Sequence, residues 1–361
     1  PLPIGERTLG DFLRPHGYRV AVTGKTHIAA DVDGMRRLGI DPTSEKGFLI
    51  GQGGFEPFAR HDGVHATPKS SAHLAYNDFL RRHGYESKNP WQDYANSVTC
   101  PDGTIASGWY LRNSNKPSRV ADEHSETAFI TDRAMDFIRE QRDQPWCLHL
   151  SYIKPHWPYV ASAPYHQLFH PDDCLPVHRL EEERINPHPV YQAFMNNEVS
   201  KTFNRDEVRR TVVPTYMGLI KQIDDHLGRL FSFLEAEHRM NDTMIVFTSD
   251  HGDYLGDHFL GEKELFHDCA AKLPLILYDP DASADPTRGT VNDTLIESID
   301  LLPTFLESCH LDHADHILEG ESLMPLVRGA KARRYHDDVF SELDYAYYDT
   351  RRQLNLEPSE A

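Results

Sequence analysis

Five side chains able to bind a metal ion or a proton follow one apolar segment of the chain. The run TMIVFTS is followed by DHGDYLGDH, which supplies Asp250, His251, Asp253, Asp257 and His258. A carboxylate and an imidazole on adjacent residues are suitable ligands for a divalent cation. The alternative is a plain turn in which the aspartate caps the next helix. We interpret Asp250 and His251 as metal ligands, and the other three groups as lying behind the site or facing solvent.

Two other apolar runs are followed by basic and imidazole side chains. Lys25 and His27 come after YRVAVTG, Lys154 and His156 come after WCLHLSYI, and Lys263 precedes LPLILYD. Lysines and histidines around a divalent cation suit a tetrahedral oxyanion such as sulfate or phosphate, because they stabilise the charge of the transition state. One histidine can also protonate the leaving oxygen. Each group alone is typical of a surface or loop residue, so the prediction depends on their meeting.

The order of the apolar segments predicts the elements that must position these groups. Strands are expected at 18–24, 146–153, 243–249 and 273–279, and helices at 7–17, 125–141, 216–237 and 298–308. Alternating strands and helices favour an α/β fold with a mainly parallel sheet and helices on both faces. Sites in such sheets lie beyond the carboxyl ends of the strands, so we expect the three clusters at one edge. Residues 41–118 and 170–205 are predicted to be irregular.

Composition limits the classes of partner. The chain has 361 residues and a formal net charge of −19, with 56 acidic against 37 basic residues. This balance argues against nucleic acid or an anionic membrane as the main partner, although a local basic pocket can still bind an anionic substrate. No apolar run approaches the roughly 20 residues of a membrane span. The five cysteines are scattered and form no C-x-x-C pair, so no disulfide framework is expected.

Five motifs occur in an order that resembles a known family. They are G-K-T-H at 24–27, K-P-H-W-P-Y at 154–159, S-D-H-G-x-x-L-G-D-H at 249–258, I-D-L-L-P-T-F-L at 299–306 and G-E-S-L-x-P-L at 320–326. Together they resemble the sulfatase family of the alkaline phosphatase superfamily. NKPSRVADEHSE and VASAPYH are similar to its phosphonate monoester hydrolase branch, whereas G-K-T-H looks more like ordinary sulfatases. The resemblance runs from about residue 7 to 342.

The resemblance implies an alkaline-phosphatase-like α/β/α sandwich with a small C-terminal antiparallel subdomain. On that pattern residues 1–333 form the catalytic domain, and residues 334–361 begin a subdomain that is mostly missing. Asp250 and His251 would bind one divalent metal ion, namely calcium, or manganese or zinc. The imidazole suits manganese, iron or zinc somewhat better than calcium, although relatives with this histidine can use calcium. The side chains implied to contact the sulfate or phosphate group are Lys25, His27, His156 and Lys263.

Two expected segments of the family are missing from the sequence. Family members begin with a strand that ends in paired aspartates, and then carry C/S-x-P-x-R, whose Cys or Ser becomes formylglycine. Both come before G-K-x-H in the family, and the first 24 residues contain neither. CLPVHR and NKPSR are rejected as substitutes, because His178 and Asn115 stand where Arg and the nucleophile should be. We therefore expect a fragment that lacks the N-terminal nucleophile segment and the C-terminal end.

Three hypotheses follow for function. The first is a hydrolase of sulfate monoesters that uses a formylglycine outside this sequence. The second is a phosphonate monoester or phosphodiester hydrolase with the same site, and the third is a fragment that is non-catalytic as it stands. In the first two, the partner is a small-molecule sulfate, phosphonate or phosphate ester, and homo-oligomers are compatible with the sequence. The chain begins with Pro1, so nothing in it assigns a compartment.

Overall fold

The computed structural model describes residues 4–342 except 27, 29, 62–73, 313–317 and 331–335. Two compact units make up the chain. The first contains Pro1–Asp173 and Pro214–Leu234, and the second contains Cys174–Val213 and Glu235–Ala361. The predicted boundary at 333/334 falls within residues 331–335, which lie outside the described part, so it stays a prediction. Among the described residues, no helix is both long and apolar enough to cross a membrane.

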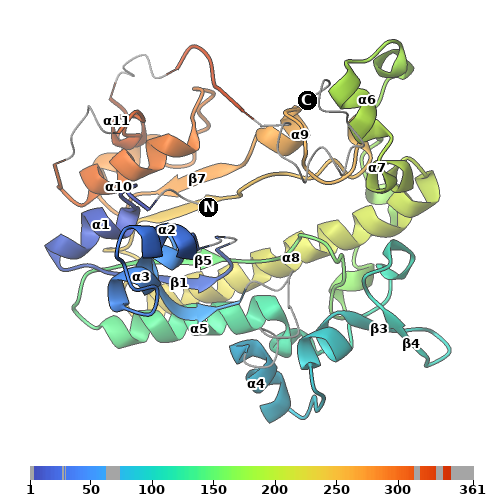
Figure 1. Ribbon diagram of the computed structural model, residues 1–361, viewed down its shortest axis with the longest axis horizontal. Helices are drawn as coiled ribbons and strands as arrows, with labels where there is room; N and C mark the ends of the chain where they lie inside the picture. The colour runs from blue at the N-terminus through green and yellow to red at the C-terminus, as the bar shows by residue number, and fades with distance from the viewer. Residues whose placement is uncertain are drawn as a thin grey trace. The chain divides into compact units, whose positions relative to one another are not determined.

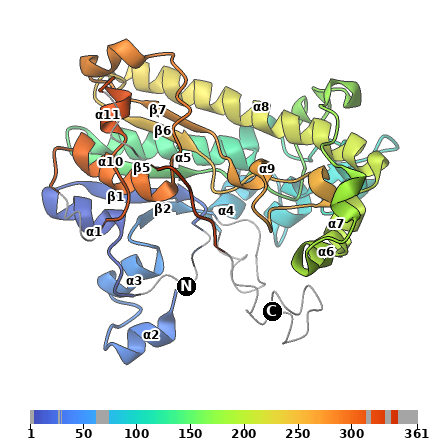
Figure 2. The same ribbon diagram turned by 90° about the horizontal axis from the view of Figure 1, so that it is seen from above.

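The first unit is built on a three-stranded parallel sheet in the order β2-β1-β5 (Figures 1 and 2). Its strands are β1 at Arg19–Gly24, β2 at Glu56–Arg60 and β5 at Trp146–Ser151. The central strand β1 is covered on both faces, as its continuous apolar run predicts. Gly24 pairs with Arg60 on one side and with Ser151 on the other. The carboxyl ends of all three strands therefore lie at one edge of the sheet.

Two long helices pack in the first unit. Helix α5 at Glu126–Gln141 begins at Ser125, whose side chain accepts a hydrogen bond from the amide of Ala128, and it packs against all three strands. Helix α8 spans Asp206–Ala236, and its residues 214–234 belong to this unit. Figures 1 and 2 show α5 and α8 side by side. Asp132 of α5 and Arg229 of α8 form an ion pair of 2.7 Å. Both predicted helices are confirmed.

The segment 41–118, predicted to be irregular, contains regular elements. They are α3 at Glu45–Gly51, β2, α4 at Ala75–Arg82, a π-helix at Trp91–Ala95, and the hairpin of β3 at Ser97–Thr99 and β4 at Ile105–Ser107. Tyr76 and Leu80 of α4 are fully buried in a cluster with Phe129 of α5. The prediction was wrong because these elements are short, and tertiary burial rather than sequence periodicity stabilises them.

Short helices are found elsewhere in the first unit as well. Helix α1 at Leu9–Leu13 continues as a 3-10 turn to His16 and stops at Gly17. Gly17 has φ of 85°, a backbone conformation that glycine adopts without strain. The helix predicted at 7–17 is therefore confirmed. Helix α2 at Val32–Arg37 follows β1 and begins at Asp31, whose side chain accepts from the amide of Gly34.

The second unit contains a two-stranded antiparallel sheet. Strand β6 at Ile245–Thr248 pairs with β7 at Leu275–Tyr278, with Ile245 opposite Tyr278. Both strands lie where the sequence predicts them, and they pair antiparallel, whereas the strands of the first unit's sheet are parallel. Ile276 of β7 is 62% exposed. An apolar run predicts a strand and not its direction, which the connection and the partner strand decide.

Helices and turns complete the second unit. Segment 170–205, predicted to be irregular, contains α6 at Pro189–Met195 and α7 at Glu198–Phe203. These helices begin at His188 and Asn197, whose side chains accept hydrogen bonds from backbone amides. The predicted helix at 298–308 is confirmed as a 3-10 turn followed by α10. The remaining helices are α9 at Asp268–Ala271, α10 at Leu301–Ser308 and α11 at Met324–Val327.

Candidate active site

The first unit brings two of the predicted clusters to one sheet edge. The backbone amide of Lys25, just beyond β1, donates to the carbonyl oxygen of Ser151 at the end of β5, at 3.3 Å. The amide of His61, just beyond β2, donates to the carbonyl of Gly24 at 2.9 Å. Lys25 is half-buried there. His27 lies outside the described residues, so its predicted role stays a prediction.

His156 lies in a turn that fixes its ring. Its amide donates to the carbonyl of Ile153 at 3.1 Å, and its Nδ1 lies 2.7 Å from the carbonyl oxygen of Trp157. A carbonyl oxygen only accepts, so Nδ1 carries the hydrogen and the lone pair of the neutral ring is on Nε2. A histidine held in this way can take up a proton at Nε2 and deliver it from the same atom.

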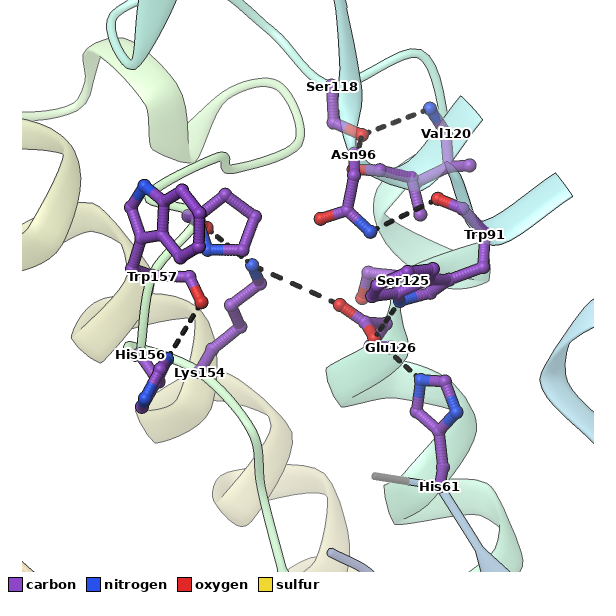
Figure 3. Close-up of polar contacts among 12 residues, drawn as sticks. His61, Trp91, Asn96, Ser118, Val120, Ser125, Glu126, Lys154, His156 and Trp157 are labelled. Atoms are coloured by element: carbon purple, nitrogen blue, oxygen red, sulfur yellow. Dashed lines mark hydrogen bonds and ion pairs between the residues drawn. The ribbon is translucent and has the colours of Figure 1, made fainter. Parts of the chain in front are cut away.

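Lys154, two residues earlier, is buried rather than directed to solvent. Its side chain is 7% exposed, its Nζ donates to the carbonyl oxygen of Pro158 at 2.7 Å, and the same atom lies 4.0 Å from Oε2 of Glu126. Figure 3 shows this ammonium group between the 154–158 segment and α5. Burial lowers the pKa of Lys154, and the charge of Glu126 opposes that effect. The lysine is therefore part of a buried polar network.

Glu126 is the centre of that network, and it was not among the residues predicted from the sequence. Its Oε1 accepts from Nε2 of His61 at 2.6 Å and from Nε1 of Trp91 at 2.7 Å. Burial alone raises the pKa of Glu126. The hydrogen bond and charge of His61, the charge of Lys154 and the Trp91 hydrogen bond together lower it to about 2. The sequence does contain one sign that Glu126 is buried. It lies four residues before the buried Ile130, on the apolar stripe of α5.

The second unit holds the candidate metal ligands. Asp250 and His251 follow β6, and Nε2 of His251 lies 3.5 Å from Oδ2 of Asp250. Nδ1 of His251 lies 2.8 Å from the carbonyl oxygen of Gly252, so the hydrogen is on Nδ1 and the lone pair on Nε2. Two ligands at about 2.1–2.4 Å from one cation and roughly at right angles would be about 3.2 Å apart. The spacing fits one shared ion.

The backbone after His251 requires a glycine. A Cβ on Gly252 would lie 1.9 Å from the carbonyl oxygen of Cys269, closer than any real contact. The amide of Gly252 also donates to the carbonyl of Ala270 at 2.9 Å. The loop of Asp250 and His251 is thus packed backbone to backbone against α9, which explains the glycine of the Asp-His-Gly motif.

Lys263 lies in the same electrostatic environment as His251. Burial is the main reason why the pKa of Glu264 is raised. Glu262 adds to it, while the charges of Lys263 and His251 oppose it. The side chains of Lys263 and His251 therefore both lie near one carboxylate, that of Glu264, which the sequence patterns did not predict. Among the described residues, no group of three or more His, Cys, Asp or Glu side chains could hold a metal ion. Asp250 and His251 therefore offer two donors, one oxygen and one nitrogen.

The end of the motif makes structural contacts within the second unit. Nδ1 of His258 lies 2.7 Å from Oε1 of Glu183, and its amide donates to the carbonyl of His178 at 2.8 Å. The amide of His178 donates to Oδ1 of Asp257 at 2.9 Å. Oδ1 of Asp253 accepts from the amide of Leu255 at 3.1 Å. Asp257 and His258 thus connect segment 174–188 to the S-D-H-G-x-x-L-G-D-H motif by hydrogen bonds.

The sequence is similar to sulfatases and related hydrolases. A family model described as Sulfatase matches residues 1–310. The multifunctional alkaline phosphatase superfamily protein PehA of Trinickia caryophylli is 28% identical, with 96% of this chain and 67% of PehA covered. An arylsulfatase of Clostridium perfringens (strain 13 / Type A) is also 28% identical, with 59% of this chain and 44% of the arylsulfatase covered.

Two solved structures share the fold. A phosphonate monoester hydrolase from Silicibacter pomeroyi is 26% identical with a TM-score of 0.76, covering 93% of this chain and 64% of that chain. The phosphonate monoester hydrolase of Agrobacterium radiobacter is 24% identical with a TM-score of 0.77, covering 98% and 68%. This chain thus spans about two thirds of their length, and the predicted alkaline-phosphatase-like α/β fold is confirmed. With the family model covering most of its length, the chain belongs to the sulfatase family.

Proposed function

We propose that the chain forms the larger part of a divalent-metal-dependent hydrolase of sulfate monoesters. The observation that carries the proposal is the Asp250–His251 pair, whose Oδ2 and Nε2 lie 3.5 Å apart with the imidazole tautomer fixed by Gly252. An oxygen and a nitrogen donor suit calcium, manganese or zinc. When bound, such an ion polarises the ester oxygens and offsets their negative charge.

The remaining site residues are proposed to bind the ester and move a proton. Lys25 and Lys263 are cationic groups that attract the oxygens of a sulfate or phosphonate. His156 is proposed to hold a proton at Nε2 and give it to the leaving oxygen, because its Nδ1 is already engaged by Trp157. His27 is proposed as a further contact of the anionic group. The proposed nucleophile is a formylglycine in a C/S-x-P-x-R segment, which residues 1–361 do not contain.

A phosphonate monoester is the second candidate substrate. In sequence, PehA of the alkaline phosphatase superfamily matches 96% of this chain and the arylsulfatase 59%, and in structure the phosphonate monoester hydrolase from Silicibacter pomeroyi matches 93%. Sulfate monoesters, phosphonate monoesters and phosphodiesters share one negative charge and a tetrahedral centre, so the same cationic groups can bind all three. What differs is the fourth substituent, an oxygen in the sulfate and a carbon in the phosphonate.

Substrate profiling of the full-length protein tests the proposal. The panel is 4-nitrophenyl sulfate, 4-nitrophenyl phenylphosphonate and bis(4-nitrophenyl) phosphate, each assayed with calcium, manganese or zinc after removal of metal with a chelator. Metal-restored turnover with the highest kcat/KM for the sulfate supports the first candidate, and the highest value for the phosphonate replaces it with the second. Absence of turnover on all three esters with every metal would refute both.

A further inference from the structure

A buried carboxylate ties together three separate segments of the first unit. Glu126 stands in the first turn of α5 and is 6% exposed. It accepts hydrogen bonds of 2.6 Å from His61, beyond β2, and of 2.7 Å from Trp91, in the π-helix (Figure 3). Hydrogen bonds to a buried ionised group are short and strong. Glu126 is thus held from two sides and cannot turn away from the third segment.

That third segment carries His156. The ammonium group of Lys154 lies 4.0 Å from Oε2 of Glu126 and donates to the carbonyl of Pro158 at 2.7 Å. The hydrogen bond from Nζ of Lys154 to the carbonyl oxygen of Pro158 closes a loop over the segment K-P-H-W-P, and His156 is its middle residue. The carbonyl of Trp157, which accepts from Nδ1 of His156 at 2.7 Å, belongs to the same closed loop. The conformation of the segment therefore determines where Nε2 of His156 lies.

A second path of contacts leads from the same segment to Glu126. The ring of Trp157 packs against Trp109 with centroids 4.6 Å apart, and Trp109 packs against Trp91 at 5.8 Å. Trp91 is the residue whose indole N–H donates to Glu126. Edge-to-face aromatic pairs of this kind are favourable beyond the apolar area that they bury. Segment 154–158 is thus joined to Glu126 through Lys154 at one end and through Trp157 near the other.

The described residues leave little room for a ligand beside the ion pair. Glu126 and Lys154 line a cavity of about 20 Å³ together with Ser125, Ser162 and Gln222. A volume of that size holds about one water molecule, far less than an ester with its leaving group needs. Both side chains are also nearly buried, at 7% and 6% exposed, so we assign neither of them a contact with the substrate. Any effect of the pair on the reaction must pass through the segment that it holds.

We propose that Glu126 and Lys154 are positioning residues for His156. The buried ion pair holds segment 154–158 in one conformation and thereby keeps Nε2 of His156 ready to donate to the leaving oxygen. The inference rests on the proposed function, in which His156 protonates that oxygen. Removal of the negative charge of Glu126 leaves the Lys154 ammonium buried without a counterion. The lysine must then lose its proton or leave the cavity, and either change releases the segment.

Two variants of the full-length enzyme test the inference. Glu126→Gln removes the charge and nearly preserves the shape, while the matched control Glu123→Gln removes the same charge at an exposed position three residues earlier. With a poor leaving group such as an alkyl alcohol, Glu126→Gln is expected to lower kcat about 100-fold, because a well-placed general acid contributes about that much. KM is expected to change less than about threefold, since substrate binding is unaffected. Glu123→Gln is expected to match the wild type.

The leaving group separates positioning from general damage. 4-Nitrophenolate departs with little protonation, so Glu126→Gln is expected to lower kcat less than about fivefold for the 4-nitrophenyl ester. An equal loss with both leaving groups would overturn the inference, because a merely damaged fold does not distinguish between them. A wild-type kcat with the alkyl ester would overturn it as well. If Glu126→Gln does not fold, Lys154→Met is measured with the same two esters and judged by the same ratio.

A double-mutant comparison separates this inference from the proposed function. The acid role of His156 predicts that His156→Ala lowers kcat for the alkyl ester strongly. Adding Glu126→Gln to His156→Ala should then cause no further loss, because both changes remove one function. A further loss equal to that of Glu126→Gln alone would overturn only the positioning role. Wild-type activity of His156→Ala would overturn the acid role and the inference with it.

Discussion

His156 and His251 are held in the same way by their own backbone. In each, Nδ1 lies within 2.8 Å of the carbonyl oxygen of the next residue, Trp157 or Gly252. The lone pair of each neutral ring is therefore on Nε2. The same device serves two different proposed roles, because an Nε2 lone pair can bind a cation or accept a proton. Both roles use Nε2, so neither requires a change of tautomer.

Removal of the carboxylate ligand is expected to remove both metal and activity. Asp250→Ala in the full-length enzyme leaves His251 without its neighbouring oxygen donor, so metal affinity should fall at least about 100-fold. Metal content by elemental analysis and kcat for the preferred ester are the measurements. Asp242→Asn, at an exposed position before β6, is the control. Retention of both metal and turnover by Asp250→Ala would contradict the assignment.

Stability is expected to fall in acid because of Glu126. Its pKa is lowered from 4.5 to about 2 in the folded protein. The ionised carboxylate therefore stabilises the fold above the unfolded pKa, and this contribution is lost as pH falls from about 4.5 toward 2. Between pH 6 and pH 3 the loss from this group should be about 2 kcal/mol.

Urea unfolding at the two pH values measures that loss. Glu126→Gln has no titrating carboxyl at this position, so its unfolding free energy should fall by about 2 kcal/mol less than that of the wild type over the same interval. Glu123→Gln, with an exposed carboxyl replaced, should behave as the wild type. An identical acid dependence in Glu126→Gln and the wild type would contradict the strong ionisation of the buried group.

A methyl group at position 252 is expected to disrupt the metal loop. Gly252→Ala places a Cβ 1.9 Å from the carbonyl oxygen of Cys269, so the backbone of one of the two segments must move. We expect at least about 2 kcal/mol loss of unfolding free energy, together with weaker metal binding. The control is Gly228→Ala, an exposed position in α8 with no atom within 4 Å of the new Cβ.

Gly228→Ala should instead stabilise the protein by about 0.5–1 kcal/mol, because alanine is the better helix former. Thermal and urea unfolding of both variants give the comparison. Metal affinity of Gly252→Ala is measured separately by competition with a chelator. Wild-type stability and metal affinity in Gly252→Ala would show that the loop tolerates a side chain, contrary to the close approach seen in the structure.

The aspartate of the I-D-L-L-P-T-F-L motif is expected to matter for stability. Asp300 is fully buried, and its Oδ atoms accept from the amides of Glu297 and Glu321, each at 2.8 Å, with His336 at 3.2 Å. It thus joins the start of α10 to segment 320–323. Asp300→Ala leaves two partly buried amides without acceptors, and about 2–4 kcal/mol of unfolding free energy should be lost.

The control for that change lies on the same helix. Glu307→Gln alters an exposed carboxylate of α10, and such surface changes usually stay within about 0.5 kcal/mol. Chemical unfolding followed by circular dichroism compares the two variants. Equal stability of Asp300→Ala and Glu307→Gln would show that the buried hydrogen bonds of Asp300 contribute nothing net to folding.

The sequence predicted those parts of the fold that have strong local signals. The apolar stripe of α8 and the Ser125 cap of α5 each depend on neighbouring residues, so pattern alone finds them. The meeting of Lys25 with segment 151–156 also follows from local signals, because two parallel strands end there. The antiparallel direction of β7 has no such signal, since strand pairing depends on residues distant in sequence.

The network around Glu126 shows why part of the candidate site escaped prediction. His61 and Glu126 lie 65 positions apart in the chain, and His61 follows a short strand with weak periodicity. A pairing across that distance exists only after β2 and α5 have packed. A glutamate within the apolar stripe of an amphipathic helix was the one visible sign, because an unpaired buried carboxylate is too costly to retain.

The aromatic contacts beside His156 allow intrinsic tryptophan fluorescence to report on the 154–158 segment. Three of its four tryptophans, Trp91, Trp109 and Trp157, pack in one chain of rings, and Trp157 directly follows His156. Three of the four indole rings in residues 1–361 therefore lie in the network beside the proposed proton donor. Ligand binding, acidification or a loosened 154–158 segment should change the emission spectrum of the unlabelled protein, and stopped-flow instruments can follow that change in real time.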